Sequence, residues 1–150
     1  MMHGLISSII QLLSSLANCL LDDTIPQIVN GLKELQKILE RSLYEKRSKS
    51  VEHLKASKLD LQRRNKEAIM LRTMNQDQAM RKEIEFDKYM NDEIKKVDCK
   101  IIDELDQCRS DQVKTLENAN VPHFFYTDKQ IEIKLQMYIL DFILRIQSTR

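Results

Sequence analysis

The sequence predicts an all-α fold, with a small helical head formed by both termini and a long antiparallel helical hairpin that resembles a coiled-coil stalk. Glycine and proline, which readily end helices, are absent from residues 32–121. Charged residues make up 31% of the chain, and apolar residues recur between them at helical spacing. We therefore expect one helical domain over residues 1–150, with the head in residues 1–44 and 121–147 and the hairpin stalk in residues 45–120.

The first predicted helix covers residues 5–21 and contains no charged side chain. Its apolar face is wide enough to contact more than one neighbour, so we expect the helix to be buried in the head. A signal peptide or membrane span is the less favoured alternative, because no Lys or Arg precedes the apolar run and polar side chains interrupt it at helical spacing. The main stripe comprises Leu5, Ile9, Leu12, Leu16 and Leu20.

A second helix is predicted to begin at Thr24. Residues 24–27 have the form of a capping box, with Gln27 reaching back to Thr24, and Pro26 is tolerated in a first helical turn. The apolar stripe of this helix belongs first to the head and then thins among charged residues, as expected for a stalk. Its members are Ile28, Leu32, Leu35, Leu39, Leu43, Val51, Leu54, Leu61 and Ala68.

The apolar repeat fails at residues 73–78, where small polar residues gather, and we expect the chain to reverse there. One unbroken helix is the alternative, because neither glycine nor proline marks a turn. Beyond this segment the apolar positions repeat every 11 residues, about 3.67 per turn, which predicts a nearly straight helix. The stripe comprises Met90, Ile94, Val97, Ile101, Leu105, Cys108, Gln112 and Leu116.

The two predicted arms carry opposite charge. Residues 31–75 contain 12 Lys or Arg and 6 Asp or Glu, a net charge of +6, whereas residues 76–120 contain 8 and 12, a net charge of −4. Pairing the arms places opposite charges along both flanks of a thin apolar seam and favours an antiparallel register. The same complementarity allows the arms to pair between two chains, so a homodimer is an alternative to the intramolecular hairpin.

The second arm is predicted to end at residues 118–120, where asparagine suits a left-handed C-cap, and Pro122 follows. Residues 127–130 repeat the capping-box form and open a last helix. Apolar side chains surround most of this helix, so we expect it to be buried on several sides, against the first helix and the start of the second. They are Ile131, Ile133, Leu135, Met137, Tyr138, Ile139, Leu140, Phe142, Ile143, Leu144 and Ile146.

Catalytic and metal-binding patterns are not recognisable in the sequence. His3, His53 and His123 lie far apart without a ligand at the spacing of a zinc site, so we expect no metal and no cofactor. The carboxylates have Lys or Arg nearby, which favours solvated helix faces over a catalytic role, and we expect no enzymatic activity. Three cysteines without CxxC spacing indicate reduced thiols in an intracellular protein. The net charge of +1 argues against general binding of nucleic acid.

Two small clusters are candidates for binding a protein partner. Methionines at the predicted hairpin tip form either an adaptable docking surface or ordinary seam packing. The aromatic cluster after Pro122 either anchors a partner or caps the core of the head, and the second interpretation is favoured. Basic residues within 46–49 and 63–66 are import signals or contacts for an acidic partner, although pairing with the acidic arm is favoured. The candidate partner-binding residues are Met70, Met74, Met80, Phe124, Phe125 and Tyr126.

Several segments at both ends of the chain resemble the gonadal protein family, which includes the DiGeorge syndrome critical region protein six. They are LANCLLDDTIPQIVNGL at 16–32, SLYEKR at 42–47, KIIDELD at 100–106, TLENANV at 115–121 and LQMYILDFILR at 135–145. The resemblance covers about residues 16–147 and is weak along the stalk. It implies no enzymatic activity and no cofactor, a nuclear location, and a role in cell migration and tissue development.

From these features we expect a non-enzymatic scaffold or adaptor that binds a protein partner through helical surfaces, in the nucleus, the cytoplasm or both. A membrane-peripheral or lipid-handling protein that uses residues 5–21 is the alternative. A nucleic-acid binder that uses its basic clusters ranks last, because the chain has no overall basic excess.

Overall fold

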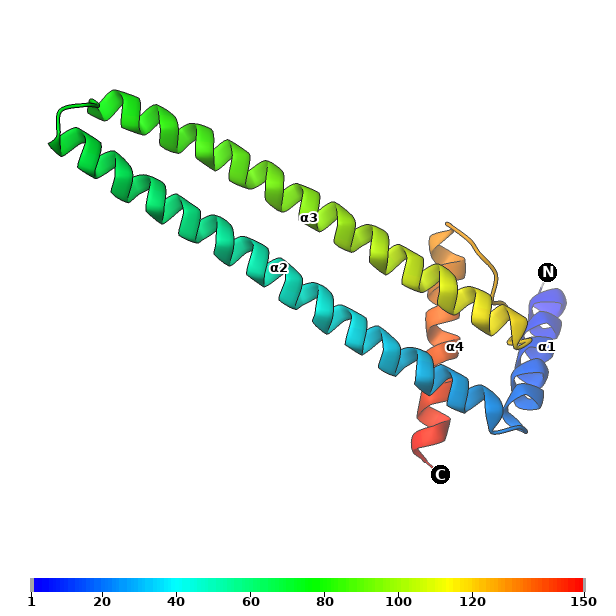
Figure 1. Ribbon diagram of the computed structural model, residues 1–150. Helices are drawn as coiled ribbons and strands as arrows, with labels where there is room; N and C mark the ends of the chain where they lie inside the picture. The colour runs from blue at the N-terminus through cyan, green and yellow to red at the C-terminus, as the bar shows by residue number, and fades with distance from the viewer. Residues whose placement is uncertain (1, 150) are drawn as a thin grey trace. The chain divides into compact units, whose positions relative to one another are not determined.

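The computed structural model describes residues 2–149, and every regular element within them is a helix (Figure 1). The elements are α1 (Met2–Leu20), α2 (Thr24–Met70), α3 (Gln76–Asn118) and α4 (Gln130–Ser148). The predicted all-α fold class is therefore confirmed. The chain divides into two compact units, unit 1 (Met1–Ile38 with Asp106–Arg150) and unit 2 (Leu39–Leu105). The boundaries of the predicted head and stalk stay predictions.

Within unit 2, α2 and α3 run antiparallel to each other, as the cyan to yellow ribbons of Figure 1 show. The Nε atom of Arg47 donates a hydrogen bond to Oδ1 of Asp98 at 2.7 Å, and Nζ of Lys58 lies 2.7 Å from Oδ1 of Asp87. Arg47 and Lys58 are 11 residues apart, and Asp98 and Asp87 are 11 residues apart in the reverse direction. These pairs join the basic arm to the acidic arm, with one register along the seam.

The seam of unit 2 follows an 11-residue repeat. In α2 the buried side chains are Leu43, Leu54 and Asn65, each 11 residues from the next. In α3 the buried Ala79 is followed 11 residues later by Met90, which is half-buried. An 11-residue period keeps both stripes on one side of nearly straight helices. Most of the other seam side chains are only half-buried, so the core of this unit is thin.

Two members of the predicted stripes are not buried. Leu35 and Leu105 are both exposed, although the spacing of apolar residues assigned them to the core. Conversely, the buried Asn65 does not belong to the predicted stripe, and its Nδ2 donates to the carbonyl oxygen of Ala79 at 3.4 Å. The apolar spacing alone therefore misplaces individual positions, because a polar side chain with a partner can occupy a seam site.

The reversal expected at residues 73–78 begins slightly earlier, where α2 ends at Met70. Arg72 adopts a left-handed conformation with φ of 57°, and the amide of Thr73 donates to the carbonyl of Ala68, as in a Schellman motif. Asn75 and Gln78 then form a reciprocal capping box that opens α3. The amide of Gln78 donates to Oδ1 of Asn75 at 2.8 Å, and the amide of Asn75 donates to Oε1 of Gln78 at 3.1 Å. The single unbroken helix does not form.

Unit 1 has one apolar core, to which all four helices and the loop before α4 contribute. Leu116 and Ile143 are the most enclosed side chains, at 1% and 0% exposed. The predicted C-cap is confirmed, because Asn120 has a φ of 62° and the amide of Val121 donates to the carbonyl of Leu116. The buried members of the core are Leu16, Ile25, Val29, Leu116, Val121, Phe124, Ile139 and Ile143.

The two predicted capping boxes are wrong in detail. At the start of α2 the cap is the carboxylate of Asp22, which accepts hydrogen bonds from the amide and the hydroxyl of Thr24. These bonds, the hydroxyl first, lower the pKa of Asp22. Before α4 the N-cap is Lys129, which makes no side-chain cap bond, and Thr127 bonds through its hydroxyl to the carboxylate of Glu132. In both places a neighbouring carboxylate binds the threonine more strongly than a backbone amide does.

The Arg47–Asp98 pair makes the stability of unit 2 depend on pH. The hydrogen bond from Arg47 lowers the pKa of Asp98, with a smaller opposing contribution from desolvation. The pair therefore stabilises the fold above the pKa of an unfolded aspartate, near 3.9, and this contribution is lost as the pH falls through the lower folded value. We expect the melting temperature of the wild type to fall more steeply below about pH 4 than that of the Asp98→Asn variant. Asp103→Asn, at an exposed carboxylate of α3, should behave like the wild type; equal slopes for Asp98→Asn and the wild type would contradict the prediction.

Candidate interaction surfaces

The three candidate methionines flank the turn between α2 and α3. Met70 ends α2 and is 83% exposed, and Met80 lies in the first turns of α3 and is also exposed. Met74 lies in the turn itself and is half-buried. Two of the three side chains therefore face solvent, next to the exposed Leu71. This arrangement forms a small apolar surface of unbranched, flexible side chains, of the kind that adapts to different partners.

The aromatic cluster divides between the core and the surface. Phe124 is buried in the core of unit 1, as the favoured interpretation predicts, whereas Phe125 and Tyr126 are exposed. The loop is held by Gln136 of α4, which is 5% exposed and donates through Nε2 to the carbonyl oxygens of His123 and Phe125, at 3.0 and 2.9 Å. A buried amide that bonds two carbonyls fixes the backbone on both sides of Phe124. The sequence gave no sign of this residue, because its partners are backbone atoms.

Arg109 holds the same loop from α3. Its guanidinium donates to the carbonyl oxygen of Thr127 at 2.6 Å. Thr127 itself is buried, and the amide of Lys129 donates to its hydroxyl at 3.2 Å. The loop before α4 is therefore fixed from two helices, and it presents Phe125 and Tyr126 from a defined backbone.

The N-terminal half of α1 exposes apolar side chains. Leu16 is the one buried side chain of this helix, and the prediction that the helix is buried in the head is wrong. The core of unit 1 contacts only the C-terminal half of α1, through Leu12, Leu16, Cys19 and Leu20. The exposed apolar residues are Leu5, Ile6, Ile9, Ile10 and Leu13, each between 48% and 65% exposed. The width of the apolar face was read correctly from the sequence, but no neighbour covers its first half.

By length and composition, α1 also meets the requirement for a helix that crosses a membrane. Core helices of soluble proteins and signal sequences meet the same requirement, so this property alone assigns no location.

The last helix, α4, is apolar on two faces but buries only one. Gln136, Ile139 and Ile143 are buried against unit 1. The prediction that this helix is buried on several sides is wrong, because unit 1 supplies neighbours for that face alone. The opposite face exposes Ile131, Met137, Tyr138 and Phe142. A division of the apolar residues into two arcs would have separated these faces in the sequence.

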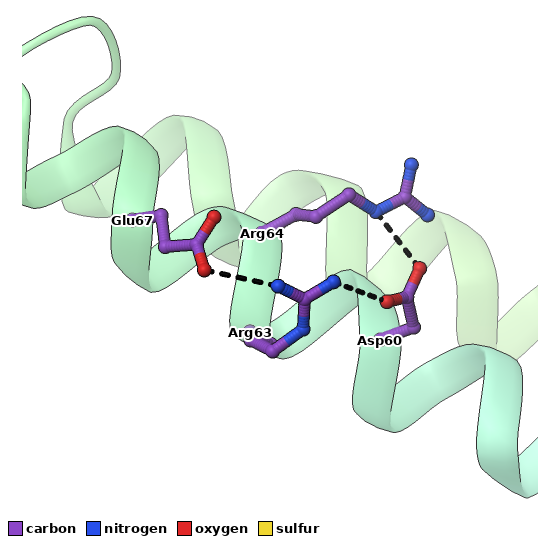
Figure 2. Close-up of polar contacts among 4 residues, drawn as sticks. All are labelled: Asp60, Arg63, Arg64 and Glu67. Carbon is purple, nitrogen blue, oxygen red and sulfur yellow. Dashed lines mark hydrogen bonds and ion pairs between the residues drawn. The ribbon is translucent and has the colours of Figure 1, made fainter.

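The second basic cluster forms ion pairs along its own helix (Figure 2). Arg63 bonds Asp60 at 2.8 Å and Glu67 at 3.0 Å, and Nε of Arg64 lies 3.0 Å from the other oxygen of Asp60. The hydrogen bond from Arg63 lowers the pKa of Asp60 and, in turn, raises that of Arg63. The expectation that these arginines pair with the acidic arm is therefore wrong, whereas Arg47 of the first cluster does pair with it. Pairs at i,i+3 and i,i+4 form readily because both partners lie on one helix face.

Within residues 2–149, no three His, Cys, Asp or Glu side chains lie close enough to hold a metal ion. A hollow of about 180 Å³ lies between α2, α3 and α4 in unit 1. It is smaller than the roughly 300 Å³ at which ligand pockets begin. Apolar side chains dominate its lining, which includes Val29, Leu32, Leu140 and Leu144.

The fold and its surfaces define an all-helical protein whose prominent exposed features are apolar helix faces. The chain belongs to the DiGeorge syndrome critical region 6 (DGCR6) protein family, whose sequence model matches residues 6–150. It is 38% identical to "Gonadal protein gdl" of Drosophila melanogaster over 139 residues, which cover 93% of this chain and 68% of the relative. It is 39% identical to "Protein DGCR6" of Gallus gallus over 146 residues, which cover 91% and 70%. The predicted family is therefore confirmed. Neither printed name states an enzymatic activity, and no solved structure matches the chain.

Proposed function

We propose that this protein is a non-enzymatic scaffold or adaptor that binds a protein partner through the exposed apolar half of α1. Its role lies in tissue development or cell migration, and it acts in the nucleus, the cytoplasm or both. The family supports the developmental part, since the printed names of the relatives refer to DiGeorge syndrome and to the gonad.

One observation carries the binding part, namely the five exposed apolar side chains of α1. Leu5, Ile6, Ile9, Ile10 and Leu13 lie within nine residues that contain no charged side chain. Soluble monomers rarely expose large contiguous apolar patches, and such patches mark partner or membrane surfaces. A partner helix or groove that covers this face would remove it from water and gain about 25 cal/mol for each Å² of apolar area buried.

A membrane-peripheral function is the second candidate, and the length and composition of α1 support it. Two features of the helix favour a protein partner. It has no Lys or Arg to interact with anionic headgroups, and Ser7, Gln11, Ser14 and Asn18 form a polar face along it.

The test uses a pair of double variants of α1 in the full chain. Ile6→Asp with Ile10→Asp places two charges on the exposed apolar face, whereas Ser7→Asp with Gln11→Asp places the same charges on the polar face. All four positions are exposed, so we expect both variants to melt within a few degrees of the wild type. Proximity labelling in cells should lose its specific labelled proteins in the first variant and keep them in the second.

Flotation with neutral and anionic vesicles separates the two candidate functions. We expect no flotation of the purified wild type. Flotation of the wild type that disappears in the Ile6→Asp, Ile10→Asp variant would replace the protein partner by a lipid surface. If the two variants label the same proteins as the wild type, the partner does not bind this face.

A further inference from the structure

We propose that the exposed face of α4 pairs with the same face of a second copy of this chain, as an antiparallel helix pair with two-fold symmetry. This pairing uses another helix face than the proposed function, and neither requires the other. It also differs from the pairing of stalk arms between chains, because it leaves the hairpin of unit 2 intact.

The exposed face carries the seam of a helix pair. Ile131, Leu135, Tyr138 and Phe142 follow one another at spacings of 4, 3 and 4 residues, the pattern of the a and d positions of a heptad. Ile131 is 78% exposed, Tyr138 and Phe142 are exposed, and Leu135 is partly covered by the core of unit 1. Such a stripe on a folded surface buries its side chains only when another helix is laid along it.

The charges beside this stripe identify the occupant. Lys134 and Asp141 are seven residues apart, so they share one flank of the seam. In an antiparallel pair of identical helices, Lys134 of each copy lies opposite Asp141 of the other, which gives two attractive contacts. Asp141 bonds Arg145 of its own helix through Oδ2 at 3.0 Å, and both side chains are exposed. A parallel pair would instead place Lys134 opposite Lys134 and Asp141 opposite Asp141, so the charges select the antiparallel arrangement.

A single pair of 19-residue helices forms a small interface, so the dimer is expected to be weak. A helix of this length spans about 28 Å, and a contact below the standard size of about 800 Å² per partner corresponds to a dissociation constant of about 10 to 100 μM. The wild type should therefore change from monomer to dimer over this concentration range in sedimentation equilibrium.

Two single variants and their mixture test the register. Lys134→Glu places like charges at both contacts of a homodimer, and Asp141→Lys does the same with the opposite sign. Each variant alone should dimerise at least about tenfold more weakly than the wild type. When the two variants are mixed in equal amounts, each glutamate faces a lysine and each native aspartate faces a native lysine, so a heterodimer should form with an affinity near that of the wild type.

The positions are exposed, so circular dichroism and melting should show the same fold in all samples. The Ile6→Asp, Ile10→Asp variant of α1 should dimerise like the wild type, which distinguishes this interface from the proposed partner surface. A wild type that stays monomeric to about 200 μM would overturn the proposal. Single variants that dimerise normally, or a mixture that dimerises no better than its components, would overturn it equally.

Discussion

Replacement of Ile143 by alanine is expected to lower the free energy of unfolding by about 3 kcal/mol. Ile143 is 0% exposed and contributes to the core that joins all four helices in unit 1. Truncation removes apolar contacts and leaves a cavity, because neighbours fixed in helices collapse into it only in part. Urea unfolding followed by circular dichroism measures the change.

Ile131→Ala is the matched control for this prediction. It makes the same chemical change in the same helix, at a side chain that faces solvent. We expect a change of at most about 0.5 kcal/mol when both proteins are measured at about 1 μM, below the expected range of dimerisation. Equal losses in the two variants would show that α4 does not pack on unit 1 through the face that contains Ile143.

Replacement of Gln136 by methionine should destabilise the protein by about 2 kcal/mol or more. The substitution keeps the length of the side chain but removes the amide that bonds the carbonyl oxygens of His123 and Phe125. Both carbonyls then lose a partner in a partly buried site, at a cost of about 1 to 3 kcal/mol for each group that stays unsatisfied. Urea unfolding measures the global effect.

A local measurement separates the loop from the rest of unit 1. Chymotrypsin cleaves after aromatic residues, and we expect faster cleavage at residues 124–126 in Gln136→Met, because the loop opens more often. Gln130→Met, at an exposed position of the same helix, should be cleaved at the rate of the wild type. An unchanged cleavage rate in Gln136→Met would mean that Arg109 and the packing of Phe124 suffice to hold the loop.

Much of the fold could be predicted because its determinants are local. The 11-residue stripe of α3 and the opposite charges of the arms are periodic features of single segments, and the register that follows is seen in the Arg47–Asp98 and Lys58–Asp87 pairs. The C-cap at Asn120 was predicted for the same reason, since the cap depends on one residue and its own helix.

The surfaces could not be predicted in the same way. An apolar face shows that a helix gains free energy by leaving water, but it does not show which neighbour is present. For this reason α1 and α4 were both assigned to the core, although each presents apolar side chains to solvent. The buried Gln136 and Asn65 escaped notice because each bonds backbone carbonyls, whose positions no side-chain pattern encodes. The capping box at Asn75 was legible in the sequence, but the search there considered only glycine and proline.

The repeat of unit 2 also determines how the length of the hairpin can change. Removal of 11 residues from α2 together with the facing 11 from α3 brings the next buried side chain and the next ion pair into the same places, as Leu54 would replace Leu43. Removal of four or seven residues would turn the remaining stripe away from its partner, because these numbers are not whole turns of a helix with 3.67 residues per turn. The hairpin therefore has a modular unit of about 16 Å, and its reach is adjustable in steps of this size without redesign of the seam.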